Sequence, residues 1–150
     1  MRTCRFAGRH HVAVGETRTA SRATVTVGGP RPIQFCPFPL VDDELDNICH
    51  LARARMQPPL HDAFAMASWI HLICVRCHPF EDGNGRISRI LASIPLMMDG
   101  LPPLYISLLQ RGVYYDAINQ AYGGDHRAMV ECILQGTEEA LDAVVNQSPT

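Results

Sequence analysis

The chain has 150 residues, of which 47% are hydrophobic and 19% are charged, and its formal net charge is −2. That length suits one globular domain, and the composition excludes a disordered or fibrous chain. No apolar stretch reaches the roughly 18 residues that a membrane-crossing helix needs, and the N-terminus has no apolar run for a Sec signal. We therefore expect neither a membrane protein nor a Sec-secreted one.

Positive charge is concentrated near the N-terminus, and all of it is arginine. The chain has no Lys, which excludes a Schiff-base lysine and the lysine of a Walker A phosphate-binding loop. Residues 1–31 hold six Arg and a single acidic residue, Glu16. We interpret this stretch as a solvated basic segment; a nucleic-acid-binding arm and a mitochondrial targeting sequence are the alternatives. Because it lacks a clear amphipathic apolar face, a mitochondrial targeting sequence is the less favoured interpretation. We expect a cytoplasmic location, with mitochondrial import and a non-Sec secretion route as alternatives, and no nucleic-acid partner.

The first predicted element is a small β-hairpin at residues 23–35. The preceding residues, 1–22, show no convincing periodicity and are assigned to the basic segment. An alternating β-branched run then leads to a turn at Gly28-Gly29-Pro30, and the chain returns as a second arm. Pro32 restricts that arm to the edge of a sheet, so a hairpin is expected and a larger sheet is not.

The remainder of the chain predicts helices, because apolar residues recur at helical spacing between Pro and Gly breaks. The expected helices span residues 41–56, 60–77, 86–98, 112–122 and 125–145. The helix at 60–77 is apolar nearly all round, so it should be the buried centre, packed on the helix at 86–98. The fold class is therefore all-α with one small hairpin, in a domain at 23–145 followed by a tail at 146–150.

Two cysteines near the end of the expected central helix allow two interpretations. Cys74-Val75-Arg76-Cys77-His78 matches the C-x-x-C-H pattern of covalent haem attachment. The same cysteines lie in an apolar helical pattern, where a reduced Cys behaves as a small hydrophobic residue. We favour the structural interpretation. No second Cys pair at ligand spacing supports a zinc site.

Residues 78–89 combine the groups that a phosphoryl-type transfer needs. Gly83 and Gly85 lie where a loop enters a helix, so free N–H groups and the positive end of the helix dipole converge on a place suited to phosphate. Arg86 and Arg89 are three residues apart on that helix, and guanidinium groups pair well with phosphate oxygens.

The same segment holds a metal ligand and a base. Asp82 offers the hard oxygen that binds Mg²⁺ against a polyphosphate, and His78 can accept a proton near neutral pH. Each residue alone has an ordinary interpretation: a helix cap for the His, a turn residue for the Asp, solvent-facing charge for each Arg. Phe80 is expected to anchor the loop in the core. The joint order of these residues within one short segment favours a functional site.

That order also carries a family resemblance. The segment reads His78-Pro79-Phe80-Glu81-Asp82-Gly83-Asn84-Gly85-Arg86-Ile87-Ser88-Arg89. It resembles the signature of the Fic family, H-x-F-x-[D/E]-G-N-G-R-x-x-R, and matches it at every fixed position. The similarity extends, more loosely, from the hairpin to the helix near residue 134. It implies a Fic-type helical domain that transfers AMP from ATP to a Ser, Thr or Tyr hydroxyl of a target protein, with Mg²⁺.

The resemblance also implies roles for individual residues. His78 would be the catalytic base, and Asp82 would hold the metal. The anion hole would be formed by Gly83-Asn84-Gly85, with the β- and γ-phosphates held by Arg86 and Arg89. These roles agree with the chemistry, since pyrophosphate leaves on the side that carries the metal and the positive charge.

Family members cover the nucleotide with a hairpin flap, and Val27, Gly28 and Gly29 occupy that place here. The resemblance implies that a target protein docks on the flap edge by strand addition. It also implies that Tyr114 contacts the nucleotide base, although a packing role is the alternative. The phosphotransferase branch of the family has Lys where Gly85 stands, so a kinase-like reaction is the less favoured alternative.

One family feature is missing from the sequence. Many relatives carry an inhibitory helix with the pattern [S/T]-x-x-x-E-[G/N], and none of the six Glu here is followed by Gly or Asn. We expect restraint by a separate inhibitory protein or by a part of a longer chain, or no restraint. Removal of AMP, which uses that Glu in some relatives, loses support. A non-catalytic nucleotide-binding module remains an alternative, and no feature indicates an oligomeric state.

Overall fold

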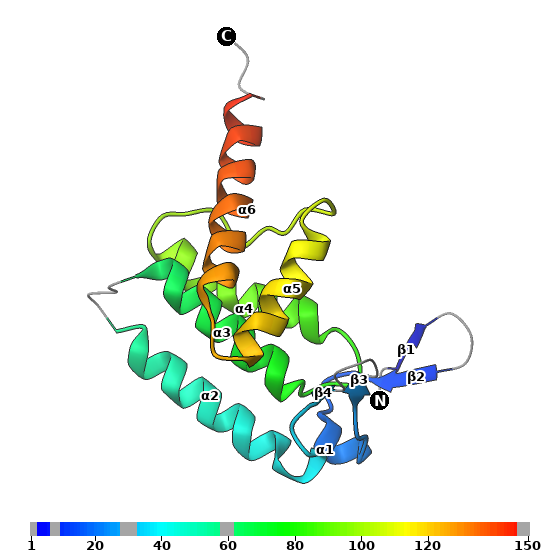
Figure 1. Cartoon of the computed structure of the whole chain (residues 1–150). Helices are drawn as coiled ribbons and strands as arrows, with labels where there is room; N and C mark the ends of the chain where they lie inside the picture. The colour runs from blue at the N-terminus through cyan, green and yellow to red at the C-terminus, as the bar shows by residue number, and fades with distance from the viewer. Residues whose placement is uncertain (1–2, 7–9, 28–32, 58–61, 147–150) are drawn as a thin grey trace.

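The computed structural model describes residues 3–6, 10–27, 33–57 and 62–146. Along the chain, two strands, a short helix and two more strands precede the long helices (Figure 1). The strands are β1 (Thr3–Phe6), β2 (His10–Ala13), β3 (Thr26–Val27) and β4 (Ile33–Gln34). The helices are α1 (Arg18–Ser21), a 3-10 turn η1 (Phe38–Leu40), α2 (Val41–Arg55), α3 (Ala63–Cys77), α4 (Asn84–Met98), α5 (Arg111–Tyr122) and α6 (Arg127–Val145). The predicted helical fold is confirmed, and the β1–β2 pair is a second hairpin beside the single one that the sequence predicts.

The core is built on α3, as its apolar composition predicts. Asp62 caps the helix by accepting the Ala65 N–H at 2.9 Å. Ala67 is completely buried, as are Ala92 and Leu96 on α4, the helix that packs most extensively against α3. The expected pairing of these two helices is confirmed, and residues 60–61 lie outside the described residues.

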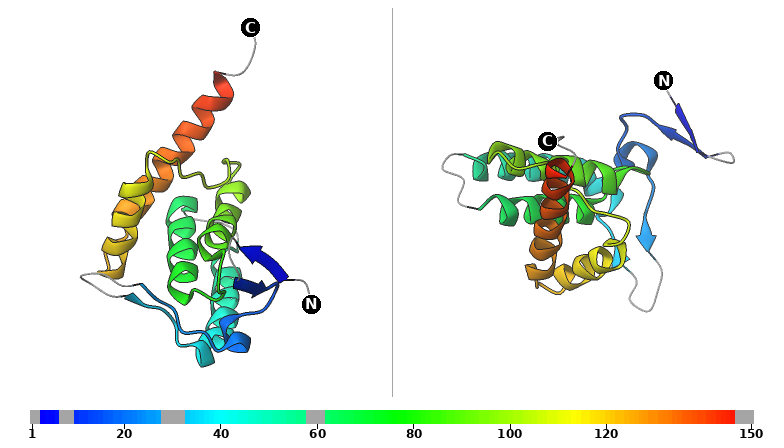
Figure 2. Two further views of the ribbon diagram at one scale, coloured as in Figure 1. Left: turned by 90° about the vertical axis from the view of Figure 1, so that its right-hand side faces the viewer. Right: turned by 90° about the horizontal axis from the view of Figure 1, so that it is seen from above.

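The other long helices cover this pair. α2 packs on α3, and α5 and α6 form an antiparallel pair whose buried residues, Ile118 and Ile133 among them, join the same core. Figure 2 shows α6 continuing beyond the remaining helices, and residues 141–146 at its end are all exposed. In the described part of the chain, no helix is both long and apolar enough to cross a membrane.

The predicted hairpin at 23–35 is confirmed in its strands. β3 and β4 pair antiparallel, with Thr26 opposite Gln34 and Val27 opposite Ile33. Gly28 and Gly29 lie outside the described residues. The hairpin is anchored to the helical core, because the Cys36 N–H donates to the carbonyl of Arg76 near the end of α3 at 3.4 Å.

The N-terminal segment is more ordered than its sequence predicts. β1 and β2 pair antiparallel from Thr3 opposite Ala13 to Phe6 opposite His10, and α1 follows. The interpretation of this segment as solvated is wrong at Arg18, whose side chain has a relative exposure of 0%. No periodicity marks these elements, because a short two-stranded pairing and a single buried cation depend on tertiary contacts.

Candidate active site

His78 lies at the end of α3 with left-handed backbone angles, φ 51° and ψ 58°. Its Nδ1 is 3.3 Å from the carbonyl oxygen of Val75. Since a carbonyl only accepts hydrogen bonds, Nδ1 carries the proton in this contact and Nε2 keeps a free lone pair. Burial lowers the pKa of His78 below its ordinary value, partly opposed by the Val75 contact. His78 is therefore neutral at pH 7 and can act as a base.

Phe35 packs against His78, although nothing in the sequence predicts a role for it in the site. Its ring stacks on the His78 imidazole with the centroids 3.9 Å apart and the planes 21° apart. Phe35 itself is buried, with a relative exposure of 7%. The residue directly after the hairpin therefore fixes one face of the candidate base. No local signal marks this contact, because it joins residues more than 40 positions apart.

The side chain of Asn84 closes the loop before α4. Its Oδ1 accepts the Phe80 N–H at 2.9 Å, and its Nδ2 donates to the Phe80 carbonyl at 2.7 Å. Asn84 is buried, and Phe80 is partly buried. With both ends of the amide occupied by Phe80, an anion at this place would meet main-chain N–H groups at the start of α4 and not the Asn84 side chain.

Gly83 and Gly85 leave room for the two arginines. Gly83 is the residue before α4, has φ +81°, and provides no side-chain cap. A Cβ added at Gly83 would lie 3.5 Å from the Arg86 guanidinium, and one added at Gly85 would lie 3.5 Å from that of Arg89. Both guanidinium groups therefore lie over the first turn of α4, where the helix dipole also favours an anion.

Asp82 faces one of these arginines. Its carboxylate is 3.1 Å from Arg86 Nη2, and the two side chains are 44% and 64% exposed. The described residues contain no group of three or more His, Cys, Asp or Glu side chains that could hold a metal alone. Mg²⁺ bound against substrate phosphates needs only one or two protein carboxylates. The exposed Asp82 carboxylate beside a phosphate-binding turn fits that mode of binding.

A buried network connects the core to the second arginine. His71 Nε2 lies 2.9 Å from the Tyr114 hydroxyl, and His71 has a relative exposure of 0%. Burial raises the pKa of Tyr114, and the Arg89 guanidinium beside its hydroxyl opposes that shift. Tyr114 is largely buried at 6% exposure, whereas its neighbour Tyr115 is 51% exposed. The geometry therefore favours Tyr114 as a packing residue that supports Arg89.

This network makes folding stability depend on pH. Burial lowers the pKa of His71 from 6.5 to about 4, and the positive charge of Arg89 contributes in the same direction. The unfolded chain then binds the proton more readily, so this stabilisation is complete above pH 6.5 and is lost as the pH falls towards 4. The loss should be about 3 kcal/mol, and His78, whose pKa is also lowered, adds to it.

Urea unfolding at pH 7 and at pH 4.5 measures this loss. His71→Gln, which keeps a neutral polar group for Tyr114, should flatten the pH dependence, whereas the exposed His50→Gln should leave it unchanged. Equal pH dependence in the two variants would show that His71 is not the titrating group.

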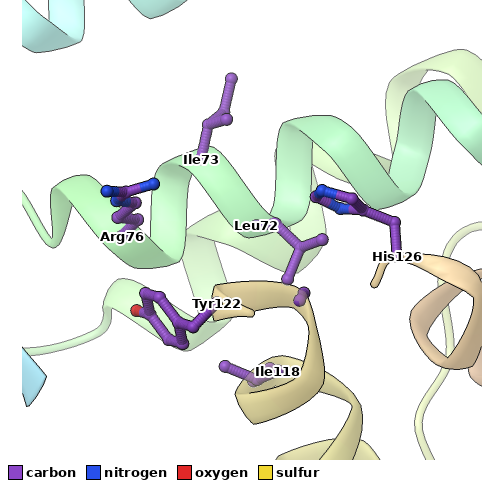
Figure 3. A pocket seen from close by; sticks show the side chains of 7 residues that line it. Leu72, Ile73, Arg76, Ile118, Tyr122 and His126 are labelled. Carbon is purple, nitrogen blue, oxygen red and sulfur yellow. The ribbon is translucent and has the colours of Figure 1, made fainter. Parts of the chain in front are cut away.

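Two other features lie near the site without belonging to it. A cavity of about 70 Å³ between α3 and α5 is lined mainly by apolar side chains, among them Leu72, Ile118 and Tyr122 (Figure 3). It is far smaller than a typical ligand pocket. Cys74 and Cys77 are buried in the core, and burial raises the pKa of both thiols to about 12. That environment is typical of structural cysteines and not of haem attachment.

Curated relatives share the sequence around this site. The chain is 45% identical over 132 residues to a protein named protein adenylyltransferase Fic from Drosophila grimshawi, covering 88% of this chain and 26% of that protein. It is 36% identical over 132 residues to the protein of the same name from Aedes aegypti, with the same coverage of 88% and 26%. The chain thus spans about a quarter of the length of these relatives.

Solved structures share the fold. Fic-1 from C. elegans superposes with a TM-score of 0.65 and 26% identity, covering 82% of this chain and 36% of that one. A Fic domain-containing signaling protein from Bacteroides thetaiotaomicron gives a TM-score of 0.76 at 21% identity, covering 91% of this chain and 57% of that one, which is a likeness of fold. The Fic/DOC family model matches residues 6–96, more than half of the chain and all of the loop from His78 to Arg89. The chain belongs to the Fic/DOC family.

Proposed function

We propose that this chain is a protein adenylyltransferase, which transfers AMP from ATP to a hydroxyl of a target protein. The observation that carries the proposal is the arrangement of a neutral base at one end of the loop and two guanidinium groups at the other. His78 keeps a free Nε2, and Arg86 and Arg89 lie over the first turn of α4. The names of the curated relatives support the same reaction.

The reaction follows from this arrangement. The target hydroxyl gives its proton to His78 Nε2, its oxygen forms a bond to the α-phosphorus, and the bond from that phosphorus to the bridging oxygen breaks. Pyrophosphate leaves with the electron pair, on the side held by the α4 N–H groups, Arg86 and Arg89. Asp82 would hold Mg²⁺, which supplies positive charge to the leaving phosphates.

The proposal includes the target and the nucleotide. We assign target docking to the edge of the β3–β4 flap, by strand addition next to Val27, with Gly28 and Gly29 over the nucleotide. A base contact by Tyr114 stays a prediction, and its burial favours a supporting role. Because the inhibitory Glu pattern is missing, we propose that restraint, where it exists, comes from a separate protein or another part of a longer chain.

Labelled ATP distinguishes this function from its alternatives. Incubation with α-labelled ATP and Mg²⁺ should place label on protein, the chain itself or a lysate target, that survives denaturation. Label from γ-labelled ATP alone would indicate phosphotransfer. Nucleotide binding without any transferred label would indicate a non-catalytic module. Chelation of the metal with EDTA should abolish the labelling, since the triphosphate charge is then unneutralised.

A further inference from the structure

Arg18, at the start of α1, is completely buried and donates four side-chain hydrogen bonds, all to main-chain carbonyls. Nε donates to His78 at 2.6 Å, Nη1 donates to Ala23 at 2.9 Å, and Nη2 donates to Cys36 at 2.7 Å and to Cys77 at 3.1 Å. The guanidinium therefore joins three segments: the start of the flap, its end, and the residue that carries the candidate base.

Such an arrangement is costly to build. Removing a cation from water is unfavourable unless its donors are satisfied, and a buried charge is weak evidence for a stabilising role. An apolar side chain would avoid the cost of the buried charge but would leave four carbonyls without this donor. The planar guanidinium, however, can hold several carbonyls in fixed directions at once. The contacts of Arg18 therefore control backbone geometry in addition to satisfying these carbonyls.

The backbone that Arg18 holds is strained. His78 has φ 51°, a region that is uncommon for residues other than glycine, and it precedes Pro79, which favours extended backbone in the residue before it. Arg18 contacts three successive carbonyls here: its side chain binds those of Cys77 and His78, and its main-chain N–H donates to that of Pro79 at 2.7 Å. Arg18 thereby holds the backbone of His78 in its strained conformation through several contacts at once.

Arg18 also holds the ring that packs on the imidazole. Its bond to the Cys36 carbonyl fixes the Cys36–Pro37 peptide, one residue beyond Phe35. The Phe35 ring lies 3.9 Å from the His78 ring. Both the backbone beneath the imidazole and the surface against its face therefore depend on the same guanidinium.

We propose that Arg18 is the positioning residue for His78: it sets the backbone and the stacking contact that aim Nε2 at the target hydroxyl. The inference deepens the proposed function and rests on it where it concerns catalysis. Its structural part, that Arg18 fixes the His78 ring against Phe35, stands on geometry and is measured separately.

NMR of histidine side chains tests the structural part without any activity. In the wild-type chain, the Phe35 ring current should displace the His78 ring-proton signals, which are assigned by their loss in His78→Ala. Arg18→Lys keeps the charge but not the planar fork, so these signals should move towards free-histidine positions. Arg22→Lys is the matched control, because Arg22 is exposed in the same segment. Ile133→Ala, in the core of α6, controls for lost stability.

Transfer kinetics test the catalytic part on the same variants. At temperatures where melting curves show each one folded, Arg18→Lys should lower kcat for AMP transfer about 10- to 100-fold, with the KM for ATP nearly unchanged, because a base displaced by about 1 Å loses its aim while the phosphate contacts remain. Arg22→Lys and Ile133→Ala should retain wild-type kcat.

The outcomes separate the two proposals. If the wild-type chain transfers no AMP, the proposed function fails, and the ring signals still decide whether Arg18 positions His78. Unmoved signals in Arg18→Lys, or a kcat loss no larger than in Ile133→Ala, would overturn the inference. If Arg18→Lys does not fold, hydrogen exchange in the wild-type chain still tests the role of Arg18. The Nε–H of Arg18 should exchange with water far more slowly than that of Arg22. Equal exchange rates would contradict the role.

Discussion

His78→Ala is expected to abolish AMP transfer and to leave ATP binding nearly intact. His78 lies on the attacking side, so its loss removes general-base assistance worth roughly 10²–10⁴-fold in rate. The groups that hold the phosphates, at the start of α4, are untouched. Transfer of labelled AMP and a calorimetric ATP titration measure the two effects on one preparation.

Two further variants make this result specific. His78→Asn lacks a base near neutral pH but tolerates the left-handed backbone better than Ala, so it should be equally inactive and more stable. Arg89→Ala should instead weaken ATP binding, because it removes a charge-assisted contact worth about 1.5–3 kcal/mol from the leaving side. Full transfer activity in either His78 variant would mean that this residue is not the base.

Gly136→Ala is expected to destabilise the fold severely. Gly136 is buried in α6, and a Cβ there would overlap the main-chain carbonyl oxygen of Tyr105. A backbone atom cannot move aside as the end of a flexible side chain can, so the free energy of unfolding should fall by about 1–3 kcal/mol or more. Thermal and urea unfolding both measure this loss.

Gly112→Ala is the matched substitution. Gly112 is also helical, in α5, but nothing lies within 4 Å of an added Cβ. Ala lowers the entropy cost of forming the helix, so this variant should gain roughly 0.5–1 kcal/mol. Similar effects of the two substitutions would show that α6 does not pack on Tyr105 as described.

The sequence predicts the parts of this molecule whose signals are local. The helix at 111–122, for example, is marked by its periodicity and by the glycines after it, and residues 78–89 carry enough spaced functional groups to indicate phosphate chemistry. The sequence predicts that α4 begins at Arg86, two residues too late. The helix begins at Asn84, whose side chain closes the loop on Phe80. Only the structure shows that the Asn84 side-chain amide is hydrogen-bonded to Phe80.

The parts that the sequence could not predict depend on contacts between distant segments. Arg18 is one of six arginines in residues 1–31, and no local pattern indicates that it is buried. Among the described residues of that stretch, it is nevertheless the one arginine found completely buried. Phe35 is one of several apolar residues near prolines, and nothing nearby indicates that its ring meets His78. The periodicity of apolar residues indicates which face of a helix or strand is buried, but not which other element packs against that face.

The contacts of Arg18 also determine when the site can form during folding. They join residues up to 61 positions apart, from Arg18 to Pro79, so a large loop must close before the catalytic loop adopts its final conformation. On a nascent chain, Arg18 can bond to the Ala23 and Cys36 carbonyls early, but its bonds to Cys77 and His78 must wait until the end of α3 has been synthesised. A fragment starting at residue 23 would contain the complete motif from His78 to Arg89 but would lack Arg18, which joins the flap to the end of α3. In such a fragment, no Arg18 bond would hold the His78 and Cys36 carbonyls in place.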